Sequence, residues 1–191
     1  GFTVERSVGG TLNYTVVDDT LPANTGSYTD ALVGEGNMYF YRAKATNSFG
    51  SSPYTSEIGI PVFGPPVLGD GSYSNSSDTV FEWQPISSAA GYEWQIAPDA
   101  AFSSVVASSS TADPAVRSYT FSGAADGVYY WHVKAKDSAA VWTEYGATWS
   151  VEIDTAAPSA ISGLTTDTTY TTVTFNWINP SDTDLNRIDI S

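Results

Sequence analysis

Apolar and polar side chains alternate along residues 127–136. Trp131 and Val133 fall in the apolar set, whereas His132 and Lys134 fall in the other set. A period of two residues with one apolar side is the pattern of a β-strand that buries one face. We therefore expect a strand here, with an aromatic inner face and a polar outer face.

A second copy of this pattern lies earlier in the chain, at residues 38–46. Tyr39 and Tyr41 stand where the later copy has Tyr129 and Trp131, and basic residues again occupy the opposite side. Because both faces of the pattern are repeated, the chain is expected to contain repeated β-domains.

Short strand-like segments separated by turn residues fill the rest of the chain, and none shows a helical period. In the centre we expect strands at 67–69, 79–83, 92–96, 105–108, 118–121, 128–136 and 148–153. The outer strands are expected at 2–7, 11–17, 27–30, 38–46, 54–62, 161–164, 172–177 and 185–190. This spacing predicts an all-β fold of tandem antiparallel seven-stranded β-sandwiches, one complete and two partial.

Two linkers divide these strands into three groups. Gly64-Pro65-Pro66 favours an extended, stiff connection, and a second proline-containing linker begins at Asp154. We therefore predict the C-terminal part of one domain at 1–63, a complete domain at 64–155 and the N-terminal part of a third at 156–191.

These residues resemble fibronectin type III domains of the kind found in tandem on bacterial and archaeal extracellular proteins. The resemblance covers the whole chain and rests on Trp83 and Trp177, on residues 27–30 followed by Gly36, and on repeated Lys-Ala pairs. It implies that the two aligned tyrosines, Tyr39 and Tyr129, bond through their hydroxyls to upstream backbone. The loop at 138–142 departs from the Asn/Gly turn that is usual there, and no Arg-Gly-Asp triplet occurs.

The resemblance also implies that the chain begins at strand C of one domain and ends at strand C of another. Residues 159–191 would then supply strands A to C, and residues 8–62 would supply C′ to G. Three arrangements satisfy this: a longer tandem array, head-to-tail strand addition between subunits, or closure within one chain, which the adjacent prolines disfavour. The strand between subunits would involve Leu185, Ile188, Ile190, Phe2 and Val4.

The chain has a net charge of −14, from 21 acidic and 7 basic residues. Nucleic-acid binding depends on basic residues that neutralise phosphates, so this balance argues against a DNA or RNA partner. No apolar run reaches the roughly 18 residues that a spanning helix needs, so no membrane insertion is expected in this segment. The wealth of Ser, Thr, Gly, Asn and Asp indicates an extracellular or cell-surface location.

Few residues suggest chemistry. His132 is the only histidine, and the alternation predicts a surface position for it without a catalytic constellation. The acidic pairs at 18–19 and 182/184 lack EF-hand spacing and are expected to be solvated loop charges. We therefore expect no enzymatic activity, no catalytic residue and no cofactor. Calcium in a linker, near Asp154 or Asp182, is kept as an alternative.

Two aromatic residues near the end of the central domain are candidate contacts. Trp142 and Tyr145 lie in the predicted F–G loop, and exposed aromatic rings can stack on sugars or on a partner protein. The competing interpretation is that Trp142 covers the end of the sandwich. Asn13 and Asn75 match the Asn-x-Ser/Thr glycosylation pattern.

The sequence therefore favours a non-catalytic structural component of an extracellular, cell-surface or filamentous assembly. Its repeated domains would act as spacers or polymer units, and its partners would be other copies of itself or neighbouring domains of the same polypeptide. The alternative is a binding module, either an adhesin or a carbohydrate-binding accessory module of a secreted enzyme, with glycan as the partner.

Overall fold

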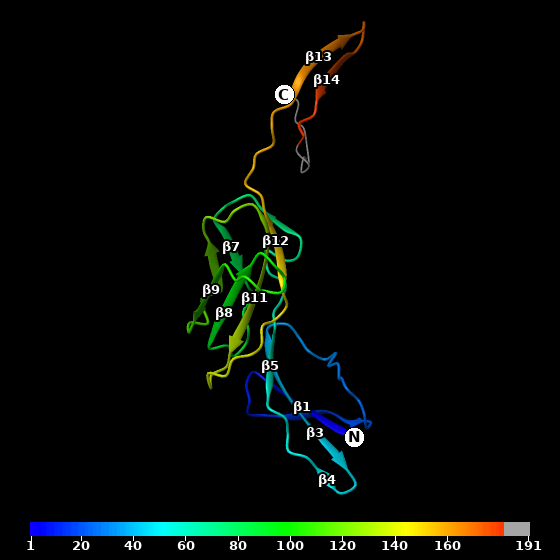
Figure 1. Cartoon of the computed structure of the whole chain (residues 1–191), viewed down its shortest axis with the longest axis vertical. Helices are drawn as coiled ribbons and strands as arrows, with labels where there is room; N and C mark the ends of the chain where they lie inside the picture. Colours follow the sequence, from blue (N-terminus) through cyan, green and yellow to red (C-terminus); the bar gives the residue numbers. More distant parts are fainter. Residues whose placement is uncertain (182–191) are drawn as a thin grey trace. The chain divides into compact units, whose positions relative to one another are not determined.

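The computed structural model describes residues 1–181, and its contacts divide the chain into two units, Gly1–Asp154 and Thr155–Ser191. Among the described residues every regular element is a β-strand (Figure 1). The all-β fold with antiparallel sheets that the sequence predicts is confirmed. The finer division into three domains stays a prediction.

Residues 2–62 form a single sheet, the first sheet. β1 lies between β2 and β3, and β3 also pairs with β4 and β5, always antiparallel. Gly9 adopts a φ of 79°, a conformation that glycine reaches without strain, at the turn that follows β1. The strands are β1 (Phe2–Val8), β2 (Thr15–Leu21), β3 (Asn37–Asn47), β4 (Gly50–Ser51) and β5 (Ile58–Val62).

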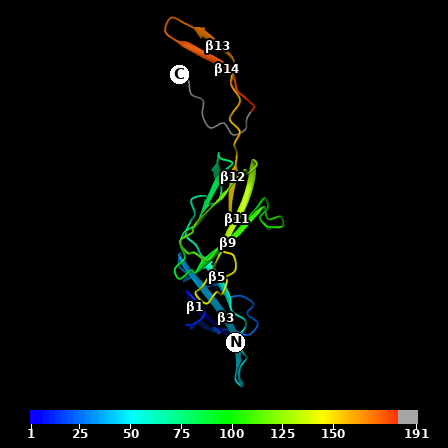
Figure 2. The same cartoon turned by 90° about the vertical axis from the view of Figure 1, so that its left-hand side faces the viewer.

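Residues 64–154 fold into two sheets, which together form the middle sandwich. One sheet has the order β6-β12-β11-β8-β9, and the other pairs β7 with β10. Figure 2 shows the paired strands β11 and β12 side by side. The strands are β6 (Ser72–Ser74), β7 (Thr79–Glu82), β8 (Gly91–Ala97), β9 (Ala107–Thr111), β10 (Ser118–Phe121), β11 (Gly127–Lys136) and β12 (Trp149–Ile153).

Aromatic side chains fill the core between these two sheets. Phe81 of β7 and Trp83, the first residue after β7, are each 1% exposed. Phe81 meets Trp131 edge-on with ring centres 5.3 Å apart, and Trp83 lies 5.2 Å from Trp94. These contacts place β7 and β10 opposite β8 and β11, which is how strands B and E face strands C and F in a fibronectin type III-like sandwich.

The first sheet and the middle sandwich share a continuous core where they meet, at the junction. Met38 and Phe40 of β3 are fully buried and belong to the same cluster as Trp83. The Phe63 ring, just before the linker prolines, lies 6.3 Å from the Tyr92 ring. Residues 1–154 therefore form one compact unit. Backbone hydrogen bonds of 2.7 Å also cross the junction, from Ser87 to Gly36 and from Glu144 to Gly59.

The second unit contains an antiparallel pair of strands, the tail hairpin. It consists of β13 (Ser162–Thr168) and β14 (Val173–Ile178). The Thr169 N–H donates to the Thr172 carbonyl at 2.9 Å and closes the turn between them. All side chains of the two strands are exposed except Trp177, which is half buried. Within the part of the chain that the structure describes, β14 pairs with β13 alone.

Two predicted strands are wrong. Residues 27–30 form no strand, although the matching segment of the middle sandwich is β10. β10 pairs with β7, and the described residues give the first sheet no counterpart of β7, so 27–30 lacks a ladder partner. Residues 67–69 form a bend, and β6 pairs with the edge of β12 instead. The predicted strand at 185–190 lies outside the described residues.

Candidate functional site

One face of the first sheet, the open face, has no second sheet over it within residues 1–181. The strand register places Arg6 of β1, Tyr41 of β3 and Ile58 of β5 in one row on this face. Ile58 is 56% exposed. The open face is therefore a largely apolar surface that is partly in contact with solvent, and its member Tyr39 is only 5% exposed. Its other main members are Val4, Val8, Tyr39, Ile60 and Val62.

The middle sandwich shows how such a face is covered. Its Trp131 and Trp149 are paired in register, as Tyr41 and Ile58 are in the first sheet. The two tryptophans are only 1% and 9% exposed, because the sheet of β7 and β10 packs on their side. By this comparison the open face resembles a sandwich interior that no second sheet covers within residues 1–181.

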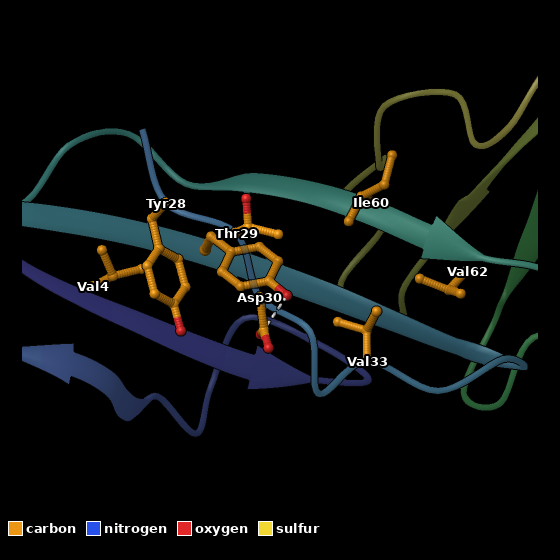
Figure 3. Close-up of a pocket in the computed structure, with 8 residues that line it drawn as sticks. Val4, Tyr28, Thr29, Asp30, Val33, Ile60 and Val62 are labelled. Carbon is orange, nitrogen blue, oxygen red and sulfur yellow. Dashed lines mark hydrogen bonds between the residues drawn. The ribbon is translucent and has the colours of Figure 1, made fainter. Parts of the chain in front are cut away.

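A groove of about 440 Å³ lies on the open face. Its walls come from β1, β3 and β5 and from residues 28–33, which cross the face without joining the ladder. Figure 3 shows Tyr28 of this crossing segment beside Val4, with Asp30 on the other side of Tyr28. Because most of the lining is apolar, covering it would remove apolar surface from water. The lining residues are Val4, Tyr28, Thr29, Asp30, Val33, Tyr41, Ile60 and Val62.

A charged cluster fastens the crossing segment to the open face. Arg6 Nη1 lies 2.7 Å from Asp30 Oδ2, and the Tyr41 hydroxyl donates to the same oxygen at 2.9 Å. The Leu32 N–H donates to the other carboxylate oxygen at 2.9 Å. Burial raises the pKa of Asp30, but these hydrogen bonds and the Arg6 charge outweigh it and leave the pKa below its ordinary value. Arg6 Nε is buried without a hydrogen-bond partner among the described residues.

A tyrosine also anchors the backbone before β3. The Gly34 N–H donates to the Tyr39 hydroxyl at 2.7 Å, and this hydroxyl donates to the Gly34 carbonyl at 3.2 Å. In the middle sandwich the Tyr129 hydroxyl donates to the Ala125 carbonyl at 3.1 Å. Both tyrosines thus make the upstream backbone bonds that the family resemblance implies. In the first sheet this bond holds the chain against an otherwise uncovered face.

The tail hairpin carries the aromatic pattern that the first sheet lacks. Phe175 and Trp177 stand two residues apart, as Phe81 and Trp83 do in the middle sandwich. Phe175 is 45% exposed, whereas Phe81 is 1% exposed. The hairpin therefore carries the Phe-x-Trp pattern of a core strand, but Phe175 is not buried in a core within the described residues. Its other exposed apolar residues include Leu164, Val173 and Ile178, at 61%, 57% and 64%.

The outer face of the middle sandwich carries a ring stack around His132. The imidazole lies between Phe102 and Tyr145, with ring centres 3.6 Å and 3.8 Å away. The His132 side chain is 8% exposed, so the predicted surface position is wrong. The side chain projects from the outer face of the sheet as predicted, but two aromatic rings cover it there. Burial, and secondly the charge of Lys134, lower the pKa of His132 to about 4. Phe102 offered no sequence signal, because it lies in the loop between β8 and β9.

Trp142 and Tyr145, the predicted ligand or partner contacts, are half buried and lie against basic residues. Lys134 Nζ lies 5.2 Å from the Trp142 ring centre and 4.9 Å from the Tyr145 ring centre, and Lys136 Nζ lies 5.2 Å from Trp142. The Tyr145 hydroxyl donates to Glu93 at 2.6 Å. These contacts give both rings a structural role, and a role in binding glycan or a partner stays a prediction.

The structure places the other candidates as follows. Asn13 and Asn75 are exposed, and their glycosylation stays a prediction. Phe2 and Val4 lie in β1, whose two edges are taken by β2 and β3, so a partner could reach them only through a sheet face. The remaining predicted intersubunit positions, Leu185, Ile188 and Ile190, lie outside the described residues.

Within residues 1–181 no group of three or more His, Cys, Asp or Glu side chains is arranged to hold a metal ion. Asp182 and Asp184 lie outside this range, and calcium near Asp154 or Asp182 stays a prediction. In the acidic pair at 18–19, Asp18 accepts a hydrogen bond from the Thr20 N–H at 2.7 Å. The described part of the chain contains no helix long and apolar enough to cross a bilayer.

No family model matches the sequence, and no curated protein matches it. Among solved structures, the FN1–FN3 domains of chicken CNTN1 are similar, with 16% identity and a TM-score of 0.39 over 95% of this chain. This chain covers 66% of the length of that structure. An Fn3-like protein from Clostridium thermocellum is 18% identical, with a TM-score of 0.35, and covers 49% of this chain and 99% of its own.

Proposed function

We propose that this protein is a non-catalytic structural component of an extracellular, cell-surface or filamentous assembly. Its fibronectin type III-like modules act as spacers or polymer units, and its partners are neighbouring modules or further copies of itself. The observation that carries this proposal is the junction, where two modules share one core. Met38 and Phe40 of the first sheet are fully buried in the cluster that also holds Trp83.

A shared core suits a spacer because it resists bending. Modules joined only by a flexible linker reorient independently, whereas modules that bury apolar surface against each other move together. At this junction the Phe63 ring lies 6.1 Å from the Trp149 ring, and a hydrogen bond of 2.7 Å joins the Glu144 N–H to the Gly59 carbonyl. We therefore expect the two modules to open as one cooperative unit.

Hydrogen exchange followed by mass spectrometry at increasing denaturant tests this on the full chain. Peptides from β3 and from β11 should lose protection at the same denaturant concentration, because the junction couples them. Phe63→Ala should separate the two transitions. Phe49→Ala is the matched control, since Phe49 is 98% exposed and lies away from the junction. Independent opening of β3 and β11 in the unmodified chain would contradict a stiff spacer.

The location and the binding alternative need separate experiments. Antibody against this chain should label intact cells of the source organism, and labelling only after lysis would contradict an extracellular role. Absence of binding to a broad glycan array would favour the structural role. Glycan binding that disappears in Trp142→Ala would favour the adhesin or accessory-module alternative instead.

A further inference from the structure

We infer that the tail hairpin of a second copy covers the open face of the first sheet, with β14 pairing antiparallel to residues 27–30. Phe175 and Trp177 of the second copy then enter the groove on the open face. This inference rests on the proposed structural function, because it names the partner that joins one unit to the next. It has its own test, which does not depend on the stiffness of the junction.

The middle sandwich supplies the template for the pairing register. There Tyr119 of β10 pairs with Phe81, and Thr120 pairs with Val80. The first sheet repeats the Ser-Tyr-Thr sequence of β10 at 27–29, and β14 repeats the Phe-x-Trp sequence that begins at Phe81. Transferring the register therefore pairs Tyr28 with Phe175 of the second copy, and Thr29 with Thr174.

Both surfaces have groups that this pairing would satisfy. Residues 27–30 form no ladder in the described chain, and β14 uses one edge only. Unpaired strand edges readily accept a further strand. On the open face Arg6 Nε is buried without a partner, and an incoming backbone carbonyl could accept its proton in a hydrogen bond. Ile58 and Phe175, 56% and 45% exposed, would both gain apolar contacts.

The length of the linker favours a second copy over closure within one chain. In the middle sandwich β7 ends shortly before β8 begins. β1 takes the place of β8 in the first sheet, because β1 pairs with β3 as β8 pairs with β11. The matched β14 should therefore end beside the start of β1. β13, antiparallel to β14, would begin at that same end, where Phe2 pairs with Ala45. That end is remote from the junction, because Val62, next to the junction, pairs with Asn37 at the opposite end of β3.

A single chain would have to span β12 and then most of β3 to reach this point. Five residues of β12 measure about 17 Å, and the stretch from Asn37 to Ala45 about 26 Å. The linker between Asp154 and Ser162 extends at most about 29 Å. Because the linker is shorter than this path, closure within one chain is disfavoured, and we assign the hairpin to the open face of a second copy.

Cysteine cross-linking of the full chain tests the register, since the sequence contains no cysteine. Chains with Thr29→Cys are mixed with chains with Thr174→Cys and oxidised. Directly opposed residues of antiparallel strands have Cα atoms about 4.5–5.5 Å apart, which a disulfide spans. We expect a covalent species of two chains. Neither variant oxidised alone should form it.

The matched control replaces Thr174→Cys by Thr171→Cys, an exposed position in the hairpin turn and roughly 10 Å along the strand from the predicted partner. The Thr29–Thr171 mixture should yield far less covalent dimer. Equal yields would mean random collision and would overturn the inference. A chain carrying both Thr29→Cys and Thr174→Cys that cross-links internally at high dilution would also overturn it, by showing closure within one chain.

Association in solution provides a second readout. Phe175→Ala and Trp177→Ala should each weaken self-association by at least about tenfold in analytical ultracentrifugation, because aromatic anchors dominate interfaces. Tyr170→Ala is the control, since Tyr170 is fully exposed in the turn outside the predicted contact. A chain that stays monomeric at high concentration overturns the inference. If β3 and β11 still lose protection together in such a chain, the proposed spacer function stands and the open face is covered by another segment.

Discussion

The first sheet and the middle sandwich are built on the same strand pattern but differ in what lies on their inner faces. Trp131 in the middle sandwich and Tyr41 in the first sheet occupy matching positions. Phe81 of a second sheet packs on Trp131, whereas the Tyr41 hydroxyl donates to Asp30 of the crossing segment and no second sheet covers Tyr41 within residues 1–181. The first sheet thus forms its hydrogen-bonded ladder although no second sheet of the described chain covers its open face, and part of its apolar surface stays exposed.

The outer faces of the two regions are, in contrast, alike. β3 and β11 both project basic residues outward, and aromatic rings lie against them in both: Arg42 lies 4.2 Å from the Tyr54 ring centre, and Lys134 lies 5.2 Å from the Trp142 ring centre. The missing cover therefore affects one side of the first sheet only. Mutations on inner faces should separate the two regions, whereas removal of these outer aromatic rings should not.

The largest expected difference in unfolding free energy comes from replacing a phenylalanine by alanine in two different surroundings. Phe81→Ala should cost about 3–5 kcal/mol of unfolding free energy, because it leaves a cavity in a closed core. Phe175→Ala should cost less than about 1 kcal/mol in a dilute, unassembled chain, since the ring is already 45% exposed. Urea unfolding monitored by circular dichroism measures both. Similar losses would show that the tail hairpin is already part of a closed core.

The next difference is in pH dependence. His132 has a pKa near 4 in the folded chain, below the roughly 6.5 of an unfolded histidine. Between these values the unfolded chain binds the extra proton, so stability falls as the pH falls through this window, by at most about 1.4 kcal/mol per pH unit. The first sheet has Arg42 at the matching position, which stays charged throughout.

Hydrogen exchange between pH 7 and pH 5, corrected for the intrinsic exchange rate, should therefore show a loss of protection that depends on His132. His132→Phe keeps a ring between Phe102 and Tyr145 but removes the titrating group, so it should flatten the pH dependence. Arg42→Lys serves as the control and should leave it unchanged. A slope that persists in His132→Phe would assign the effect to other groups.

The fold class followed from the sequence because period-two alternation is a local signal. The strands that carry it best, β3 and β11, lie close to their predicted places at 38–46 and 128–136. The prediction at 27–30 failed because strand formation there depends on a partner strand. Its sequence is as strand-like as that of β10, but only β10 has β7 beside it.

The open face was only partly predictable. The family resemblance predicted a partial domain around Phe2 and Val4, but nothing in the sequence predicted that Asp30 would form an ion pair with Arg6 over the open face. That contact joins residues 24 positions apart through a loop and has no periodic signature. The burial of His132 was missed for the same reason, because the ring that covers one side of it comes from the loop that contains Phe102.

A smaller effect is expected from the charged cluster. Asp30→Asn should destabilise the first sheet by about 1–2 kcal/mol, because Arg6 and Tyr41 lose a charged partner in a partly solvated site. The pKa of Asp30 is lowered, so its contribution is complete above the ordinary carboxyl value of about 3.9 and is lost as the pH falls through the lowered value. Wild type and Asp30→Asn should therefore converge in acid.

The matched control is Asp19→Asn, since Asp19 is exposed and lies in the same sheet. Urea unfolding of the three chains at pH 7 and pH 3 gives the comparison. A loss from Asp19→Asn as large as that from Asp30→Asn would indicate a general effect of net charge. The middle sandwich has the buried Ile96 at the position of Arg6, so β8 and β11 should keep their protection in Asp30→Asn.

The smallest effects are expected on the outer faces, where the two regions should agree. Tyr54→Ala removes the ring beside Arg42 and Lys44, and Trp142→Ala removes the ring beside Lys134 and Lys136. Each exposed cation–π contact contributes about 0.5–1 kcal/mol, so the two variants should lose similar, small amounts of unfolding free energy. Trp142→Phe keeps a ring and should retain most of this free energy, whereas Tyr54→Phe keeps the ring but also loses the hydrogen bond from the Tyr54 hydroxyl to Glu5. A loss from Trp142→Ala well above that from Tyr54→Ala would mean that Trp142 closes the end of the sandwich as well as contacting the lysines.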